Sequence, residues 1–216
     1  HDFNNLLASI RGFANLALLE MHEDPAAAQD DLRMALVSTS DAAEAVRRIQ
    51  SLYRQGDDTS DFHLVRLDEV VADVLALTQP HWKDVPQSRG VTIRVVTEID
   101  AQATVLANAG ELRRVLSNLV MNAVDAMPEG GTLTLRVATE GEWCTVDVTD
   151  TGVGMTAEQQ AQVFEPFFTT KGTAGSGLGL TMSQGIVERH GGQVGVESIP
   201  GDGSLFWFTL RAEEAL

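Results

Sequence analysis

Regular stripes of apolar residues run through the first quarter of the chain. In residues 1–22, apolar side chains recur at alternating spacings of four and three, which is typical of one face of a helix. The stripe consists of Phe3, Leu7, Ile10, Ala14, Ala17 and Met21, beside a second seam of Leu6, Phe13 and Leu16. Asp24 then precedes Pro25, an order that suits a helix cap and a first-turn proline. A second stripe follows at Leu32, Leu36, Thr39, Ala43, Val46, Ile49 and Tyr53. The pattern predicts a helical hairpin over residues 1–56.

This hairpin has wider apolar faces than two helices can bury against each other. Independent helical folds need more layers than two helices provide. We therefore expect the hairpin to form a homodimer, as a four-helix bundle. The next segment, residues 57–65, opens with a polar and acidic run and is interpreted as a linker.

After the linker, residues 66–216 mix helical and alternating patterns. Helices are predicted at 67–77, 110–127 and 178–190, and strands at 91–96, 132–138, 143–149, 193–198 and 204–210. Helices that cluster with hairpin-linked strands favour an α/β sandwich, with helices on one face of a mixed sheet. The predicted fold class is α+β, an N-terminal helical hairpin followed by that sandwich.

Charge and composition limit the classes of molecule that this chain is expected to bind. The chain has 15 Lys and Arg against 31 Asp and Glu, a formal net charge of -16, and such a surface repels nucleic acid and anionic lipid. No apolar run approaches the ~20 residues that cross a bilayer, and the opening residues do not form a signal peptide. We expect this part of the protein to be cytoplasmic and without membrane contact, which leaves membrane attachment of a longer protein open.

Cysteine and histidine give no sign of a metal centre. Cys144 shares a strand face with Val146 and Val148, so we expect a small core residue. The five histidines have no metal-ligand spacing, and no zinc site is expected.

Two glycine clusters between residues 150 and 180 point to an anionic ligand. Glycine lets the backbone approach a ligand closely and turn its amides toward phosphate oxygens. The clusters contain Gly152 and Gly154, then Gly175, Gly177 and Gly179. Asp150 ends a predicted strand directly before the first cluster, where a carboxylate can accept the exocyclic amine of adenine.

The predicted helix 110–127 adds a polar stripe to these glycines. Helical periodicity places Arg114, Asn118, Asn122 and Asp125 on one side, with the leucines elsewhere. Two asparagines one turn apart offer neutral oxygens to a cation and amides to phosphate. The combination indicates a nucleotide site.

Five segments resemble, in order and spacing, the motif boxes of sensor histidine kinases. Residues 118–123, 150–155, 164–168 and 175–180 resemble the N, G1, F and G2 boxes, and residues 1–5 resemble the H box. The resemblance covers nearly the whole chain, and the five motifs together are specific. It implies a dimerisation and phosphotransfer hairpin in residues 1–56, a linker in 57–65 and a Bergerat-type ATP-binding domain in 66–216.

The resemblance also implies the reaction, which is ATP-dependent autophosphorylation of His1 followed by phosphotransfer to an aspartate of a response regulator. A neutral imidazole is a competent nucleophile near neutral pH, and a neighbouring carboxylate can orient it or take its proton. Asp2 inherits that role by the resemblance. Asn5 would orient water in a second, phosphatase activity.

By the same resemblance, ATP and Mg²⁺ are the expected ligands of the second domain. The implied binding residues are Asn118, Asn122, Asp125, Asp150, Gly152, Gly154, Phe164, Lys171, Gly175, Ser176, Gly177, Leu178 and Gly179. Asn122 would coordinate Mg²⁺, Asn118 would help to hold the phosphates and Asp150 would bind adenine. Residues 165–176 would form a lid over the nucleotide, with Lys171 as a γ-phosphate contact.

The residues leave other functions open. Gyrase and chaperone relatives hydrolyse ATP with a glutamate one turn before the metal-binding asparagine, and this chain has Asn118 there. A nucleotide-binding scaffold that dimerises without catalysis would carry the same motifs. A dinucleotide-binding Rossmann site is disfavoured because Gly175 follows a loop, and no Gly-Lys-Ser/Thr P-loop occurs.

Overall fold

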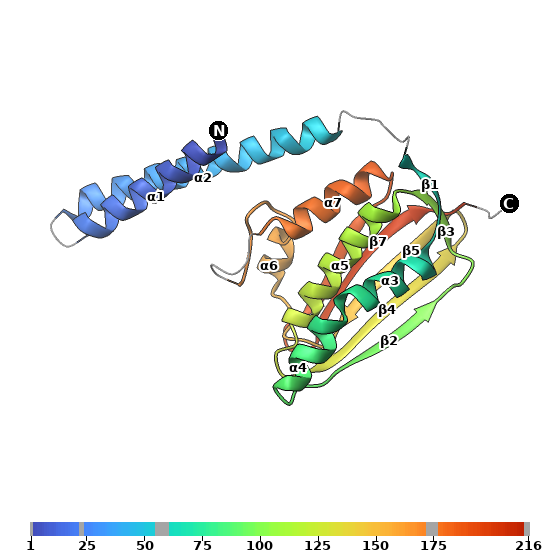
Figure 1. The fold of residues 1–216 in the computed structure, drawn as a ribbon. Helices are drawn as coiled ribbons and strands as arrows, with labels where there is room; N and C mark the ends of the chain where they lie inside the picture. The colour runs from blue at the N-terminus through green and yellow to red at the C-terminus, as the bar shows by residue number, and fades with distance from the viewer. Residues whose placement is uncertain (1, 22–23, 55–60, 172–176, 214–216) are drawn as a thin grey trace. The chain divides into compact units, whose positions relative to one another are not determined.

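The structure is a computed structural model that describes residues 2–21, 24–54, 61–171 and 177–213. Within the first two helices, the side chains of residues 2–8, 40–41 and 43–54 are outside this description. The chain divides into two compact units, His1–Asp57 and Asp58–Leu216, which are described separately (Figure 1).

The first unit is a hairpin of two packed helices, α1 (Asp2–Glu20) and α2 (Pro25–Arg54). Asp24 caps α2 as expected, since its Oδ1 accepts from the backbone N–H groups of Ala26 and Ala27, both at 3.1 Å. Among the described side chains of the hairpin, the buried ones are small: Ala17, Ala28, Ala35, Ser38 and Ala42. Small side chains let the helices approach closely, but they bury little apolar surface.

Larger apolar side chains of the hairpin stay exposed. They are Leu16, Leu18, Leu19, Met21, Leu32, Met34, Leu36 and Val37. An exposed leucine or valine is ordinary by itself, whereas a run of them along both helices is typical of an interaction face.

The second unit is built on a five-stranded sheet in the order β2-β4-β5-β7-β6. The strands are β2 (Ile93–Ile99), β4 (Gly131–Glu140), β5 (Trp143–Asp150), β6 (Val194–Ile199) and β7 (Gly203–Arg211). β2 pairs with β4 in parallel and the other neighbours are antiparallel, so the sheet is mixed as predicted.

Three helices cover one face of this sheet (Figure 1). They are α3 (Leu67–Gln79), α5 (Ala109–Asp125) and α7 (Gly179–Arg189). The core lies between the layers, where buried residues alternate along the central strands and recur along α5. Cys144, Val146 and Val148 are all buried on one face of β5, which confirms the expected place of the cysteine.

Several short elements are absent from the sequence interpretation. β1 (His63–Arg66) pairs antiparallel with β3 (Thr104–Ala107), and the remaining elements are the π-helix η2 (Pro80–Asp84), α4 (Val85–Ser88) and α6 (Ala157–Gln162). β1 occupies residues that the sequence interpretation left in the linker. Only Val65 of its residues is buried and its partner strand lies far along the chain, so no local pattern marks it.

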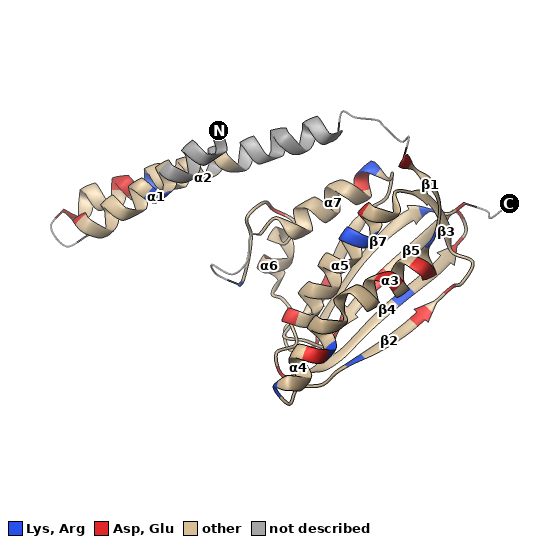
Figure 2. Cartoon of the chain, in the orientation of Figure 1, with Lys and Arg blue, Asp and Glu red and all other residues tan. Residues whose placement is uncertain are grey.

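The basic residues of the second unit are scattered among acidic ones rather than gathered in a stripe (Figure 2). Several of them are paired with acids, as Arg66 is with Asp68 at 2.5 Å and Arg113 with Asp73 at 3.2 Å. Among the described residues, no helix is both long and apolar enough to span a membrane.

Candidate functional site

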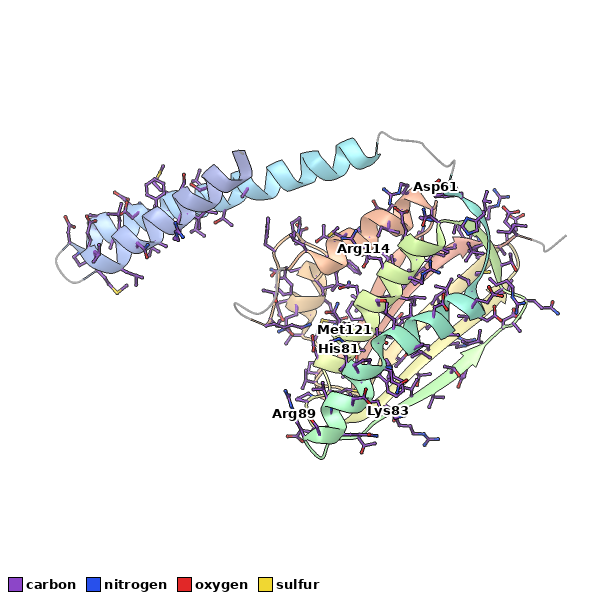
Figure 3. All side chains as sticks on the ribbon, viewed as in Figure 1. Asp61, His81, Lys83, Arg89, Arg114 and Met121 are labelled. Carbon is purple, nitrogen blue, oxygen red and sulfur yellow. The ribbon has the colours of Figure 1, made fainter. Side chains whose placement is uncertain are left out.

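A cavity of about 530 Å³ opens beside α5, the end of β5 and the start of α7. Its wall consists of Asn118, Met121, Asn122, Asp125, Ala126, Asp150, Val153, Gly154, Met155, Val163, Phe168, Thr169, Thr170, Lys171, Gly177, Gly179, Leu180, Ser204 and Phe206. Its size suits a small-molecule ligand. Met121 of α5 belongs to the wall, whereas Arg114 from the predicted polar stripe does not and donates to Met182 Sδ (3.5 Å). Both residues are labelled in Figure 3.

The cavity wall includes Asp150, a residue that is only 2% exposed. Asp150 is the last residue of β5, where the register pairs it with Leu133 of β4 and Ser204 of β7. Burial raises the pKa of Asp150, and hydrogen bonds from the backbone amides of Gly152 and Ser204 oppose that rise. The Gly152 bond is 2.8 Å long. A buried carboxylate with spare lone pairs is a strong acceptor for a ligand N–H group.

The two glycines of the first cluster lie in close contact with backbone atoms of Ala126 and Ile199. A Cβ at Gly152 would overlap the carbonyl of Ala126 and lie 2.7 Å from Asp150 Oδ1. Gly154 has φ of +64°, and a Cβ there would overlap the carbonyl of Ile199. Val153 N donates to Ala126 O at 3.0 Å, which ties the loop to the end of α5. The glycines are therefore required for the loop to hold Asp150 at the cavity.

The two asparagines of α5 have different partners. Asn118 Nδ2 donates to Ser183 Oγ at 3.0 Å, and Ser183 Oγ donates to Gly179 O at 3.0 Å. This chain of bonds holds α5 to the first turns of α7. Gly179 is needed there because a Cβ would overlap Asn118 Oδ1. Sequence reasoning missed Ser183, although its position one turn after Gly179 on the predicted helix was a usable signal.

Asn122 and Asp125, also in the cavity wall, form a cation site. Lys171 Nζ donates to Asn122 Oδ1 at 3.0 Å and to Asp125 Oδ2 at 2.6 Å. The side chains of Lys171 and Asp125 are 38% and 47% exposed, so water reaches the pair. Amide and carboxylate oxygens are the ligands that hard cations prefer, and here an ammonium group already occupies them.

The segment that carries Lys171 is attached to α7. Phe164 O accepts from Thr181 Oγ1 at 3.0 Å, and the Phe164 ring meets Phe206 edge-on with centroids 6.5 Å apart. Phe167 has an unusual φ of +68°, and its N–H donates to Gly177 O at 2.9 Å. A Cβ at Gly177, whose φ is +65°, would overlap the backbone of Phe167. These contacts hold the segment that carries Lys171 against α7 and β7.

The structure brings most of the predicted binding residues to one cavity. Its wall includes Asn118, Asn122, Asp125, Asp150, Gly154, Lys171, Gly177 and Gly179. Gly152 and Phe164 are not in the wall but contact residues that are, since Gly152 N donates to Asp150 and the Phe164 ring packs on Phe206. Leu178 is the N-cap residue of α7. His1, Gly175 and Ser176 lie outside the described residues, as do the side chains of Asp2 and Asn5.

Comparison with known proteins gives a family for the second unit. Residues 107–214 match the family model described as histidine kinase-, DNA gyrase B-, and HSP90-like ATPase. The sensor histidine kinase ZraS of Klebsiella oxytoca is 35% identical over 212 residues, which cover 97% of this chain and 44% of that protein. The chain therefore spans less than half the length of this relative.

Two solved structures extend the likeness to three dimensions. The catalytic domain of histidine kinase ThkA has a TM-score of 0.62 and 28% identity, covering 70% of this chain and 96% of that chain. Full-length ShkA in complex with AMPPNP has a TM-score of 0.61 and 25% identity, covering 99% of this chain and 45% of that chain.

Proposed function

The chain belongs to the family of histidine kinase-, DNA gyrase B- and HSP90-like ATPases, and from that premise we propose that it is the catalytic part of a sensor histidine kinase. It phosphorylates His1 with ATP and passes the phosphoryl group to an aspartate of a response regulator. The observation that carries the proposal is a single cavity whose wall contains both a buried acceptor, Asp150, and a cation site, Asn122 with Asp125. These two features suit an adenine and a metal-bound triphosphate.

The residues of the cavity fit ATP with Mg²⁺. Asp150 accepts the exocyclic amine of adenine, and the Gly152 and Gly154 loop holds the carboxylate in place. Asn122 would hold Mg²⁺ through its amide oxygen, with Asp125 beside it, and these oxygens suit a cation because they bind an ammonium group. Bound Mg²⁺ would neutralise charge on the phosphate oxygens.

Lys171 changes partners in this proposal. Its ammonium group and a metal ion cannot share the oxygens of Asn122 and Asp125, because both are cations. With a metal ion held at these oxygens, Lys171 would instead bind the γ-phosphate. Gly175, Ser176, Gly177 and Leu178 complete the proposed contacts at the start of α7.

Asn118 favours transfer to protein over hydrolysis. It stands where the hydrolytic relatives need a glutamate base, and its amide is already bonded to Ser183. A neutral amide does not accept a proton from water near neutral pH. His1 supplies the nucleophile instead: its ring nitrogen forms the bond to γ-phosphorus, the bond to the β-phosphate oxygen breaks, and ADP leaves. Asp2 orients the ring and takes its proton, and Asn5 positions water when the kinase acts as a phosphatase.

The exposed apolar residues of the hairpin support a homodimer. A second copy would bury Leu19, Leu36 and their neighbours in a four-helix bundle. We place the domain boundary between residues 57 and 62, just before β1.

The proposed partner of the whole chain in phosphotransfer is the receiver domain of the response regulator. The reaction needs ATP, so we place this part of the protein in the cytoplasm.

Labelling with γ-labelled ATP tests the proposed reaction. The wild-type chain is expected to carry label that is acid-labile and base-stable, as phosphohistidine is, and His1→Gln is expected to carry none. His81→Gln is the matched control, because His81 is an exposed histidine outside the cavity wall and should leave labelling intact. Label that survives in His1→Gln would refute the acceptor. Steady phosphate release without any labelled protein would instead favour a hydrolase.

A further inference from the structure

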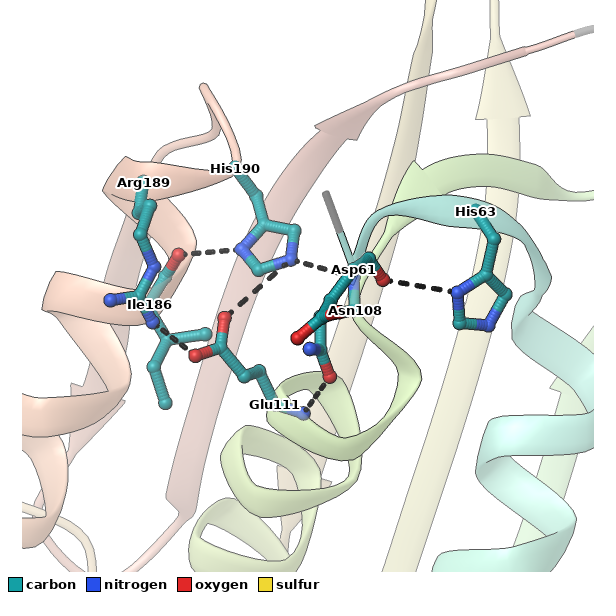
Figure 4. A network of polar contacts seen from close by, with 7 residues as sticks. All are labelled: Asp61, His63, Asn108, Glu111, Ile186, Arg189 and His190. Atoms are coloured by element: carbon teal, nitrogen blue, oxygen red, sulfur yellow. Dashed lines mark hydrogen bonds and ion pairs between the residues drawn. The ribbon is translucent and has the colours of Figure 1, made fainter. Parts of the chain in front are cut away.

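A second polar network lies away from the cavity wall, around His190 (Figure 4). The His190 side chain is fully buried, with 0% exposure, at the C-cap of α7. Its Nδ1 lies 2.8 Å from Ile186 O, and its Nε2 lies 3.1 Å from the backbone N of Asn108. A carbonyl oxygen only accepts and an amide N–H only donates, so the ring is neutral with its proton on Nδ1.

This neutral ring joins α7 to α5. Asn108 is the N-cap of α5, and its side chain accepts from Glu111 N at 3.1 Å. Glu111 also forms an ion pair with Arg189 of α7. The end of α7 is therefore bonded to the start of α5 twice, through His190 and through Arg189.

The same two helices meet again at the cavity. There Asn118 of α5 is bonded to Ser183 of α7, about two turns before the His190 end of that helix. Because helices are stiff, a change in how they meet at His190 alters the spacing of Asn118 from Gly179. The His190 contacts thus help to set the width of the cavity.

Phe62 covers the imidazole ring of His190. The two rings are stacked, with centroids 4.4 Å apart and an interplanar angle of 15°. Phe62 comes directly before β1, near the start of the second unit, which begins at Asp58. Both rings therefore belong to the nucleotide-binding unit, and Phe62 is the one that lies close in the chain to the hairpin.

We propose that Phe62 and His190 couple the interdomain linker to the nucleotide site. While Phe62 is stacked, His190 stays neutral and holds the start of α5. When the linker draws Phe62 away, water reaches the ring and Nε2 takes a proton. The protonated Nε2 can no longer accept from Asn108, so the bond that holds the N-cap residue of α5 is lost. The identity of the ligand rests on the function proposed above, but the coupling between Phe62 and Asn108 does not.

The electrostatics around the ring support this coupling. Burial lowers the pKa of His190 and Arg189 adds to the lowering, while the bond to Ile186 O and the charge of Glu111 oppose it. Glu111 Oε2 lies 3.9 Å from Nε2, so a protonated ring has an acceptor ready. Two further titratable residues, Asp61 and His63, lie on either side of Phe62 in the chain. Removing the Phe62 ring would expose part of the His190 ring to water and so weaken the effect that lowers its pKa.

The first experiment follows the His190 ring by NMR in the 216-residue chain without nucleotide. In Phe62→Ala, the pKa of His190 is expected to rise toward its ordinary value, and the Asn108 amide is expected to exchange with solvent faster. Phe62→Tyr keeps a covering ring and should match the wild type. Leu64→Ala is the matched control, because Leu64 is an exposed residue two positions further along. Unchanged values in Phe62→Ala, or equal changes in Leu64→Ala, would overturn the proposal.

The second experiment measures the affinity for AMPPNP with Mg²⁺ by calorimetry at pH 8 and pH 6. At pH 8 the ring is neutral in both proteins, so Phe62→Ala should bind nearly as well as the wild type. At pH 6 its affinity should fall by about fivefold more than that of the wild type, the effect of one lost hydrogen bond. Equal behaviour at both pH values would refute the link to the cavity. A wild type that does not bind AMPPNP would refute the proposed function, while the NMR result would still decide the coupling.

Discussion

Gly179→Ala should loosen the cavity by displacing one side chain. Gly179 is the first residue of α7, and a Cβ there would overlap Asn118 Oδ1 and lie 3.1 Å from Asn118 Cγ. The backbone conformation itself suits alanine, so the substitution acts through this contact alone. Asn118 has to move, and its bond to Ser183 Oγ is lost.

The magnitude follows from that single bond. A neutral hydrogen bond contributes about 1 kcal/mol net, and Ser183 keeps its second bond to Gly179 O, so it is not left unpaired. We expect Gly179→Ala to lower the free energy of unfolding by about 1 kcal/mol. Because Asn118 also borders the proposed phosphate site, the affinity for AMPPNP should fall on the order of tenfold.

Gly185→Ala is the matched control within the same helix. A Cβ at Gly185 has no neighbour within 4 Å, so alanine should raise the free energy of unfolding by about 0.5–1 kcal/mol through helix propensity. Urea unfolding should therefore separate the two variants by about 2 kcal/mol, with the nucleotide affinity unchanged in the control.

A double substitution tests whether the overlap is the cause. In an Asn118→Ala background the partner of the added Cβ is gone, so Gly179→Ala should cost no further stability. A Gly179→Ala protein as stable as the wild type and equal to it in AMPPNP affinity would refute the reasoning. A cost that persists without the Asn118 side chain would refute the assigned contact.

Three further outcomes follow from the structure. Burial raises the pKa of Asp150 above its ordinary value of 3.8, so ionisation of its carboxylate lowers the stability of the fold as the pH rises from 3.8 through the folded pKa. Asp150→Asn should therefore be more stable than the wild type at pH 7 in urea unfolding, yet bind AMPPNP poorly. Because the pKa of His190 is lowered, stability should fall as the pH drops below the ordinary value of 6.5, and unfolding curves of His190→Gln should lose this pH dependence. Leu36→Glu, on the exposed face of the hairpin, should convert the proposed dimer to monomer in sedimentation, and a persisting dimer would argue against that face.

Much of the fold could be predicted because its information is local. The alternation of Cys144, Val146 and Val148 marks a strand with one buried face, and Asp24 before Pro25 marks a helix start. The α+β fold class and the family resemblance are both confirmed, since the five motifs depend only on residue type and order. The pairing of Asn118 with Asn122 on one side of α5 likewise follows from helical periodicity.

Other features were decided only by tertiary structure. β1 exists because β3 pairs with it, some forty residues further along, and its own four residues have a single buried position. Lys171 is bonded to Asn122 and Asp125, 49 and 46 residues away in the chain, because their oxygens attract a nearby ammonium group. Its contact with the γ-phosphate stays a prediction.

There is a physical reason why some features could be predicted from the sequence and others depend on the tertiary structure. Periodicity and capping depend on neighbours within a few residues, so the sequence by itself determined the long helices, the central strands and the types of residue at the nucleotide site. Burial and long-range pairing depend on which segments meet. His190 looks like an ordinary helix-end residue in the sequence, and only the fold places it between Phe62 and Asn108.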